Sequence, residues 1–247
     1  MVTPASGSPA TLPAPRALRV LLVGGPAIVA AATERAFEDA GAQVSVVAEP
    51  DSAAAADQLV ESAVSTFGGL DAVVRWTPIP PSRLIAGDLA EAGTDRFGLD
   101  IERMLVGAHR IALTAARVLA RFGGGSIVLV GPIDASHAYP GRSSVAAAMA
   151  GIMGLARSLG VELAGDAVRT NVVLTGPVAA PEGRIDHGQV SRTLLRSPRP
   201  TLVTVHEIAA AIGFVAGPSS AFMTGQSLRV DAGWASLNQA PDAMRFV

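Results

Sequence analysis

The chain has 247 residues, of which 49% are hydrophobic and 16% are charged. This balance excludes a disordered chain and fits one α/β domain with a single large core. The formal net charge of −2 excludes a basic nucleic-acid footprint, and the absence of cysteine excludes disulfides and thiolate chemistry. No apolar run approaches the roughly 18 residues that cross a bilayer. We therefore expect a cytoplasmic protein without nucleic-acid or membrane partners.

Residues 1–15 are rich in Pro, Ala, Ser and Thr, and they lack the basic and apolar segments of a secretory signal. We expect a flexible leader there, followed by a single domain over residues 16–247.

The first predicted element is an apolar, branched strand at 17–23, which ends at the turn Gly24-Gly25-Pro26. Strand and helix patterns then alternate to the end of the chain, and we find no repeat. This alternation predicts a doubly wound parallel sheet with helices on both faces. Further strands are predicted at 43–47, 70–74, 126–130, 168–174 and 226–230, and helices at 28–40, 51–67, 82–122 (as two helices), 143–163 and 204–215.

Five segments between residues 17 and 235 resemble motifs of the short-chain dehydrogenase/reductase family, in the family's order and spacing. They are Phe67–Asp71 (FGGLD), Gly125–Val128 (GSIV), Gly154–Leu159 (GLARSL), Arg169–Val178 (RTNVVLTGPV) and Thr224–Trp234 (TGQSLRVDAGW). The resemblance implies a Rossmann-type fold and a relationship to oxidoreductases that use NAD or NADP. It gives no basis for choosing between the two cofactors.

The family's cofactor turn, T-G-x-x-x-G-x-G, is altered here. Gly24 remains, whereas Ile28 and Ala30 replace the other two glycines. A branched side chain at residue 28 is expected to project where phosphate would sit. Gly24 and Gly25 form either a relic phosphate loop or merely a tight turn. We favour the turn, and so expect no cofactor-binding residues and no cofactor in this chain, with NAD(P) held by an active partner.

Leu70 follows Val23 by 47 positions, which leaves room for one strand and one helix where the family has two of each. One βα unit is therefore expected to be missing. At the tip of the second strand, Glu49 and Asp51 are within reach of a ribose, although Asp51 is better explained as a helix N-cap. Residues 75–78 (RWTP) replace the family's NNAG, so Arg and Trp are expected to fill the cofactor space or to face a partner.

The family's catalytic set is a Tyr, a Lys four residues later, a Ser and an Asn. The Lys lowers the pKa of the Tyr, whose phenol otherwise titrates near 10. The Tyr and Lys positions are Val145 and Met149, and the Ser and Asn positions fall within 131–133 and 101–106, where neither residue type occurs. The chain has no lysine at all. The sequence therefore predicts no standard catalytic residue.

Polar residues gather after the strand at 126–130 and offer a replacement site, in which Tyr139 pairs with a cation and His137 titrates near neutral pH. Because Pro140 follows it, Tyr139 is expected to be extended or in a turn rather than in a helix. We therefore favour an ordinary polar surface loop over a replacement site. The other members of this group are Asp134, Ser136 and Arg142. The remaining histidines, His109, His187 and His206, share no ligand spacing, so no metal site is expected.

The helix predicted at 143–163 begins with small residues that let another helix approach closely. With the helix ending near Phe122, it matches the helices through which the family assembles. Our leading hypothesis is a catalytically inactive subunit that pairs with an active homologue, or with itself, in a dehydrogenase or reductase of acyl-thioesters. The alternatives are an oxidoreductase that uses His137 and Tyr139, and a small-molecule sensor.

Overall fold

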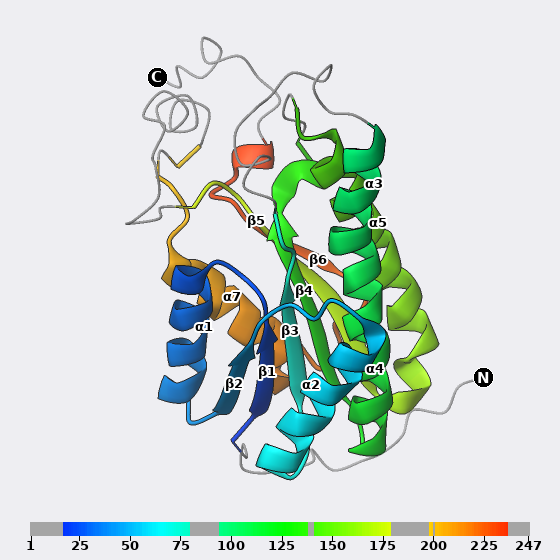
Figure 1. The fold of residues 1–247 in the computed structure, drawn as a ribbon. Coiled ribbons are helices and arrows are strands. Elements are labelled where there is room, and N and C mark those ends of the chain that lie inside the picture. The colour runs from blue at the N-terminus through cyan, green and yellow to red at the C-terminus, as the bar shows by residue number, and fades with distance from the viewer. Residues whose placement is uncertain (1–16, 80–93, 138–140, 179–197, 200, 237–247) are drawn as a thin grey trace, which may run out of the picture.

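The structure is a computed structural model and describes residues 17–79, 94–137, 141–178, 198–199 and 201–236. Six strands form one parallel sheet in the order β2-β1-β3-β4-β5-β6 (Figure 1). They are β1 (Arg19–Val23), β2 (Gln43–Val47), β3 (Ala72–Trp76), β4 (Gly125–Pro132), β5 (Val168–Thr175) and β6 (Ser227–Val230). The predicted doubly wound parallel sheet is confirmed.

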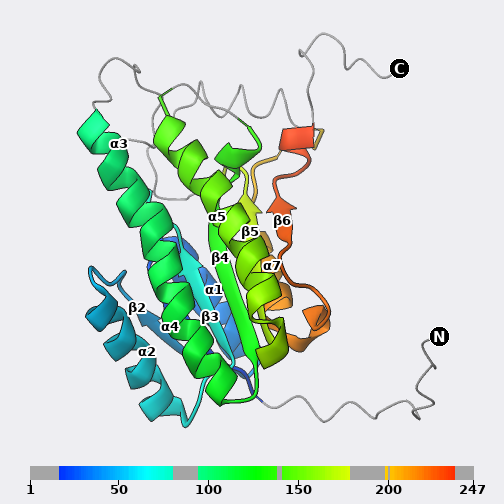
Figure 2. The same cartoon turned by 90° about the vertical axis from the view of Figure 1, so that its right-hand side faces the viewer.

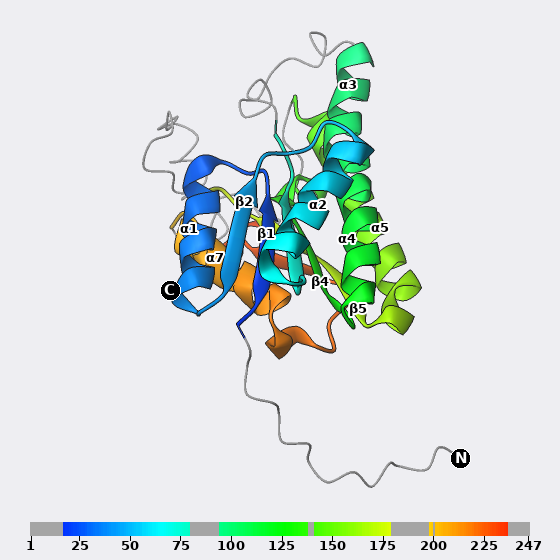
Figure 3. The same cartoon turned by 60° about the horizontal axis from the view of Figure 1, so that its bottom comes forward.

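Helices cover both faces of the sheet. One face carries α2, α4 and α5 and the other carries α1 and α7, as Figures 1 and 3 show. The α-helices are α1 (Ala27–Asp39), α2 (Ala53–Phe67), α3 (Thr94–Ile101), α4 (Gly107–Arg121), α5 (Ser143–Glu162) and α7 (Val205–Ala216). A π-helical turn at Glu102–Val106 joins α3 to α4. The leader predicted at 1–15 lies outside the described residues.

The strands owe their position to branched side chains that are buried on both faces, as expected for a parallel sheet. Along β1, Leu21 and Val23 face the core beneath α2, α4 and α5, whereas Val20 and Leu22 face the core beneath α1 and α7. This alternation follows the two-residue period of a strand. All five residues of β3 are buried, which places β3 in the interior of the sheet.

The missing βα unit is visible at the β2 edge. The chain leaves β2 and enters α2 directly, so β2 is the edge strand and Val46 is 39% exposed. The predicted N-cap of α2 was wrong by one residue. Ser52, not Asp51, is the cap, and its hydroxyl accepts a hydrogen bond from the Ala55 N–H at 3.2 Å. Serine and aspartate are about equally good caps, so the sequence alone could not separate them.

Helix α5 is long and apolar enough to cross a membrane by length and composition, so the expectation that no such stretch exists was too strong. Nearly half of its most apolar stretch is buried inside the domain. It packs on the sheet beside α4 (Figure 2). The helix is thus placed as a core helix, with an outer face of small residues.

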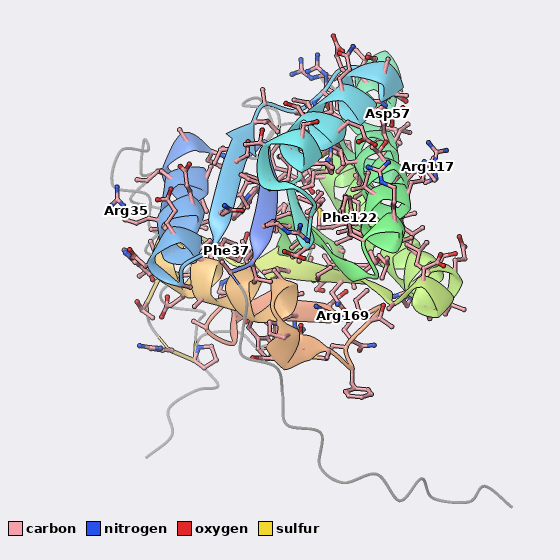
Figure 4. All side chains as sticks on the ribbon, turned by 90° about the horizontal axis from the view of Figure 1, so that it is seen from below. Arg35, Phe37, Asp57, Arg117, Phe122 and Arg169 are labelled. Carbon is pink, nitrogen blue, oxygen red and sulfur yellow. The ribbon has the colours of Figure 1, made fainter. Side chains whose placement is uncertain are left out.

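At the amino-terminal edge of the sheet, Arg169 of β5 joins three elements. Its guanidinium donates to the carbonyls of Val215, Ala216 and Gly217 at the end of α7, and also to Ser220 Oγ and Met223 O. Figure 4 views this edge from below. Because the last carbonyls of a helix have no partner within the helix, Arg169 both ends α7 and ties it to the sheet.

Strand order reverses between β1 and β3, since the chain runs to one side of β1 and then to the other. In such sheets the crevice outside the carboxyl ends of the strands at this switch point is the usual ligand site. The turn after β1, the tip of β2 and the end of β3 therefore define the place to look for function.

Candidate functional site

The turn between β1 and α1 has the backbone that a close ligand requires. Gly24 and Gly25 have φ values of +69° and +100°, which side chains rarely adopt. Gly25, Pro26 and Ala27 are exposed. The expectation for Ile28 was wrong: its half-buried side chain packs against the core beneath α1 and α7. Ile28 is therefore shared between the core and the surface rather than directed wholly at the turn.

Arg75 is the most unusual residue of this edge, because it is 1% exposed in an otherwise apolar strand. Its guanidinium pairs with Glu49 beyond β2, with Nη2 2.7 Å from Oε1. It also donates to the carbonyls of Arg103 and Met104 in the π-helical turn. Burial lowers the pKa of Arg75, and the Glu49 carboxylate opposes that shift. The ion pair thus ties β2, β3 and the start of α4 together beneath the crevice.

Trp76 lies directly on the glycine turn. A Cβ placed on Gly25 would come within 2.8 Å of Trp76 Cγ, so only glycine allows this packing. Arg75 and Trp76 were expected to fill the cofactor space or to face a partner. Both side chains are buried, and they form the floor of the crevice. The pairing of Arg75 with Glu49 was missed, although a single arginine in a buried strand signals that an acid must lie nearby.

Three buried polar atoms at this edge have no hydrogen-bond partner in the described part of the chain: Glu49 Oε2, Trp76 Nε1 and Thr77 Oγ1. Glu49 Oε2 is 3.3 Å from a Cβ built on Gly24. Buried polar groups are nearly always satisfied, so the Glu49 acceptor and the Trp76 donor left over beside the glycine turn fit a polar ligand there. The Thr77 hydroxyl lies farther along, against Gly131 at the end of β4. Beside them, Glu49 and Asp51 line a hollow of about 490 Å³ between the tip of β2 and α2.

The positions of the family's catalytic residues lie along the next crevice, above β4. Val145 and Met149 are 0% exposed and belong to the core. A Cβ on Gly131 would come within 2.5 Å of Met149 Sδ, so the thioether fills the space against the end of β4. Met104, in the π-helical turn at 102–106, is also 0% exposed. Apolar side chains therefore occupy this region.

The suggested replacement site is only partly assembled. Asp134 and Arg142 form an ion pair, with Oδ1 and Nε 2.8 Å apart. Burial raises the pKa of Asp134 to about 6, although Arg142 acts in the opposite direction. The His137 ring packs on Trp234 with ring centroids 4.0 Å apart. Ser136 is exposed, and Tyr139 lies outside the described residues.

The remaining histidines are not brought together. His109 and His206 are exposed on separate helices, and His187 lies outside the described residues. Among the residues that the structure describes, no group of three or more His, Asp or Glu could hold a metal ion.

Comparison with known proteins finds relatives that include both dehydrogenases and reductases. Residues 18–235 match the family model described as Enoyl-(Acyl carrier protein) reductase. The cis-4-hydroxycyclohexanecarboxylate dehydrogenase of Sinomonas cyclohexanicum is 32% identical over 208 residues, covering 82% of this chain and 81% of that protein. The 3-oxoacyl-[acyl-carrier-protein] reductase FabG of Vibrio cholerae is 28% identical over 178 residues, covering 72% and 71%.

A longer relative, an uncharacterized short-chain type dehydrogenase/reductase of Sinorhizobium fredii, is 30% identical over 180 residues. That match covers 70% of this chain and 31% of the relative. Among solved structures, ElxO with NADP bound has a TM-score of 0.80 at 21% identity, covering 90% of this chain and all of that one. A variant of ElxO with NADPH bound matches equally well.

The expectation that no cofactor belongs to this chain is corrected by these structures, because the same fold holds NADP and NADPH in them. The error came from Ile28, which was expected to block the turn and instead packs against the core. The unpartnered atoms around Gly24 and Gly25 also fit a polar ligand. The fold, the family match over residues 18–235 and a relative that is 32% identical lead to one conclusion: this chain belongs to the short-chain dehydrogenase/reductase family of oxidoreductases.

Proposed function

We propose that this chain is a non-catalytic subunit of a short-chain dehydrogenase/reductase assembly, which holds a dinucleotide but does not turn over substrate alone. The observation that carries the proposal is the complete burial of Val145 and Met149 at the family's Tyr and Lys positions. Residues 16–247 act as its single domain, behind a leader at 1–15.

The chemical argument concerns the proton. Carbonyl reduction by the family's scheme needs an acid beside the carbonyl and a cation that lowers the pKa of that acid. Val145 and Met149 offer neither a proton nor a charge, and their burial shows that they serve the core. The thioether of Met149 packs on Gly131, so the region below the end of β4 holds no ionisable side chain from these positions.

Binding would require different residues from catalysis, and the tip of β2, the end of β3 and the glycine turn offer candidates. The dinucleotide would supply hydride transfer when bound. In this chain Glu49 Oε2 would accept from a ribose hydroxyl and Trp76 Nε1 would donate, once a ligand displaces the side chains that bury these two atoms. The Gly24-Gly25 turn would let phosphate approach the backbone. These residues bind and orient the ligand and move no proton.

Assembly with an active homologue is supported by the outer face of α3, α4 and α5. Leu99, Val106 and Leu113 are 60%, 39% and 40% exposed along one side of α3 and α4. The adjoining side of α5 exposes Ala147 and Ala150, and Figure 2 shows α4 and α5 side by side. Small and apolar exposed residues on neighbouring helices suit close helix packing between chains. The related acyl-carrier-protein reductases suggest acyl-thioesters as the partner's substrates.

The test is to titrate the purified chain with NADH and NADPH by calorimetry and to assay reduction of a 3-oxoacyl-thioester in the same preparation. Saturable binding without turnover, together with co-purification of an active homologue after co-expression, is the expected result. Turnover by this chain alone would overturn the proposal.

A second candidate is an oxidoreductase with a replacement acid, which one observation favours. Asp134 is buried beside Arg142, and its pKa of about 6 suits proton transfer near neutrality. In that case Asp134→Asn should abolish turnover while leaving NADPH affinity within about twofold. If the chain shows no turnover, this candidate is rejected.

A further inference from the structure

A second cavity opens at the carboxyl edge of the sheet, away from the glycine turn. It has a volume of about 260 Å³ and lies between residues 199–203, the start of α7 and the turn after β6 at 229–233. Gly233, at φ +81°, closes one end, since a Cβ there would come within 2.9 Å of Pro198 Cγ. A space of this size exceeds what a single water needs many times over, so a small polyatomic group fits.

Two arginines and two acids line this cavity, but the acids are already engaged. Glu207 Oε2 accepts from the Thr204 N–H at 2.8 Å and from its hydroxyl at 3.0 Å. Asp231 accepts from the N–H groups of Gly233 and Ala235, both at 2.9 Å. Both Asp231 oxygens and Glu207 Oε2 are thus directed at the backbone of their own turns, whereas Glu207 Oε1 faces Arg199.

The arginines have no comparable partner. Arg229 is exposed and makes no ion pair within the described part of the chain. Arg199 lies 3.9 Å from Glu207 Oε1, and the two side chains are 73% and 45% exposed. An ion pair of this length and exposure contributes little. Two guanidinium groups therefore line the cavity with most of their N–H donors available.

We propose that this cavity is an oxyanion site, built by Arg199 and Arg229 to take a phosphate group. Guanidinium forks match the geometry of phosphate oxygens and bind them bidentately. The start of α7 is not the source of binding, because the Thr204–Glu207 capping box already accepts from the N–H groups of Thr204 and Glu207. The arginines carry the site.

Its position suggests which molecule brings the phosphate. The turn that begins at Asp231 continues into Trp234, which packs on His137 at the mouth above β4. A phosphate here would anchor one end of a longer molecule whose other end extends past this turn toward the partner subunit. Phosphopantetheine thioesters have this form, and this identification rests on the proposed acyl-thioester function. The oxyanion site itself does not depend on it.

The experiment measures the affinity of the full chain for inorganic phosphate and for 4′-phosphopantetheine, by calorimetry at fixed ionic strength and without nicotinamide cofactor. Arg229→Gln and Arg199→Gln should each weaken binding of both probes by at least about tenfold, as expected for loss of one charge-assisted contact. Arg35→Gln is the matched control. Arg35 is exposed on α1 and is not among the residues that line the cavity, so this change should alter the affinity by less than about twofold.

Tighter binding of phosphopantetheine than of phosphate would assign the site to a carrier, whereas equal affinity would assign it to the phosphate group alone. No saturable binding of either probe, or equal effects of Arg229→Gln and Arg35→Gln, would overturn the proposal. Urea unfolding of each variant confirms that it is folded. Neither partner nor cofactor takes part, so this result and the test of the subunit function can fail separately.

Discussion

Because the Arg75–Glu49 ion pair is largely buried, replacing Glu49 should lower the free energy of unfolding more than replacing an acid in a surface ion pair. Glu49→Ala leaves the Arg75 guanidinium, 1% exposed, with only the carbonyls of Arg103 and Met104 as partners. Removing one partner of a buried pair costs about 3–5 kcal/mol. Because the Glu49 side chain is 22% exposed and the two carbonyls remain, we expect the lower end, about 3 kcal/mol. Urea unfolding at pH 7 measures the loss.

Two controls separate burial from charge. Glu61→Ala removes the partner of Arg121 in a pair whose side chains are 51% and 53% exposed, and it should cost less than about 1 kcal/mol. Glu49→Gln keeps an oxygen that accepts from Arg75, so it should lower the free energy of unfolding by about half as much as Glu49→Ala. If Glu49→Ala and Glu61→Ala lower the free energy of unfolding equally, the account of Arg75 as a buried charge that needs Glu49 is refuted.

Three further changes test the glycine turn, the mouth and the sheet edge. Gly25→Ala should lower the free energy of unfolding by at least about 2 kcal/mol and weaken NADPH binding, because φ is +100° and Trp76 blocks a Cβ. The control Gly41→Ala, at φ +80° with nothing near a Cβ, should lower it by about 1 kcal/mol and leave NADPH binding unchanged. Equal effects of the two variants would contradict the packing of Trp76 on Gly25. The folded pKa of Asp134, about 6 against an ordinary 3.8, means that the folded state holds this proton more tightly. Stability from this group is therefore greatest below pH 4 and falls by up to about 3 kcal/mol as pH rises to 6, at about 1.36 kcal/mol per unit. Urea titrations of Asp134→Asn should lack this component, and an unchanged pH profile would disprove it. Arg169→Met should lower the free energy of unfolding by about 2 kcal/mol through its lost bonds to the end of α7, and a thermal shift below about 1 °C would argue against that role.

Much of the fold could be predicted because its signals are local. Branched runs such as 17–23 and 168–174 are buried strands, and the alternation with helices allows one topology. The missing βα unit followed from the short interval of 47 positions between Val23 and Leu70, and the sheet accordingly ends at β2.

The site was harder to predict because it depends on where side chains point. Ile28 was expected to block the turn, but as the second residue of α1 it rotates toward the core beneath α1 and α7. The Arg75–Glu49 pair joins residues 26 positions apart, and no local pattern reports such a contact. The absence of the family's Tyr and Lys at positions 145 and 149, by contrast, could be predicted from the motifs alone. The burial of Val145 and Met149 shows that these positions now belong to the core.

The most direct test of the central claim is native mass spectrometry of the chain isolated from its own source, with oxoacyl-thioester reduction assayed in the same fractions. We predict a mixed assembly in which a second short-chain dehydrogenase/reductase chain accompanies every active fraction. Activity in a fraction that contains only this chain would contradict the account.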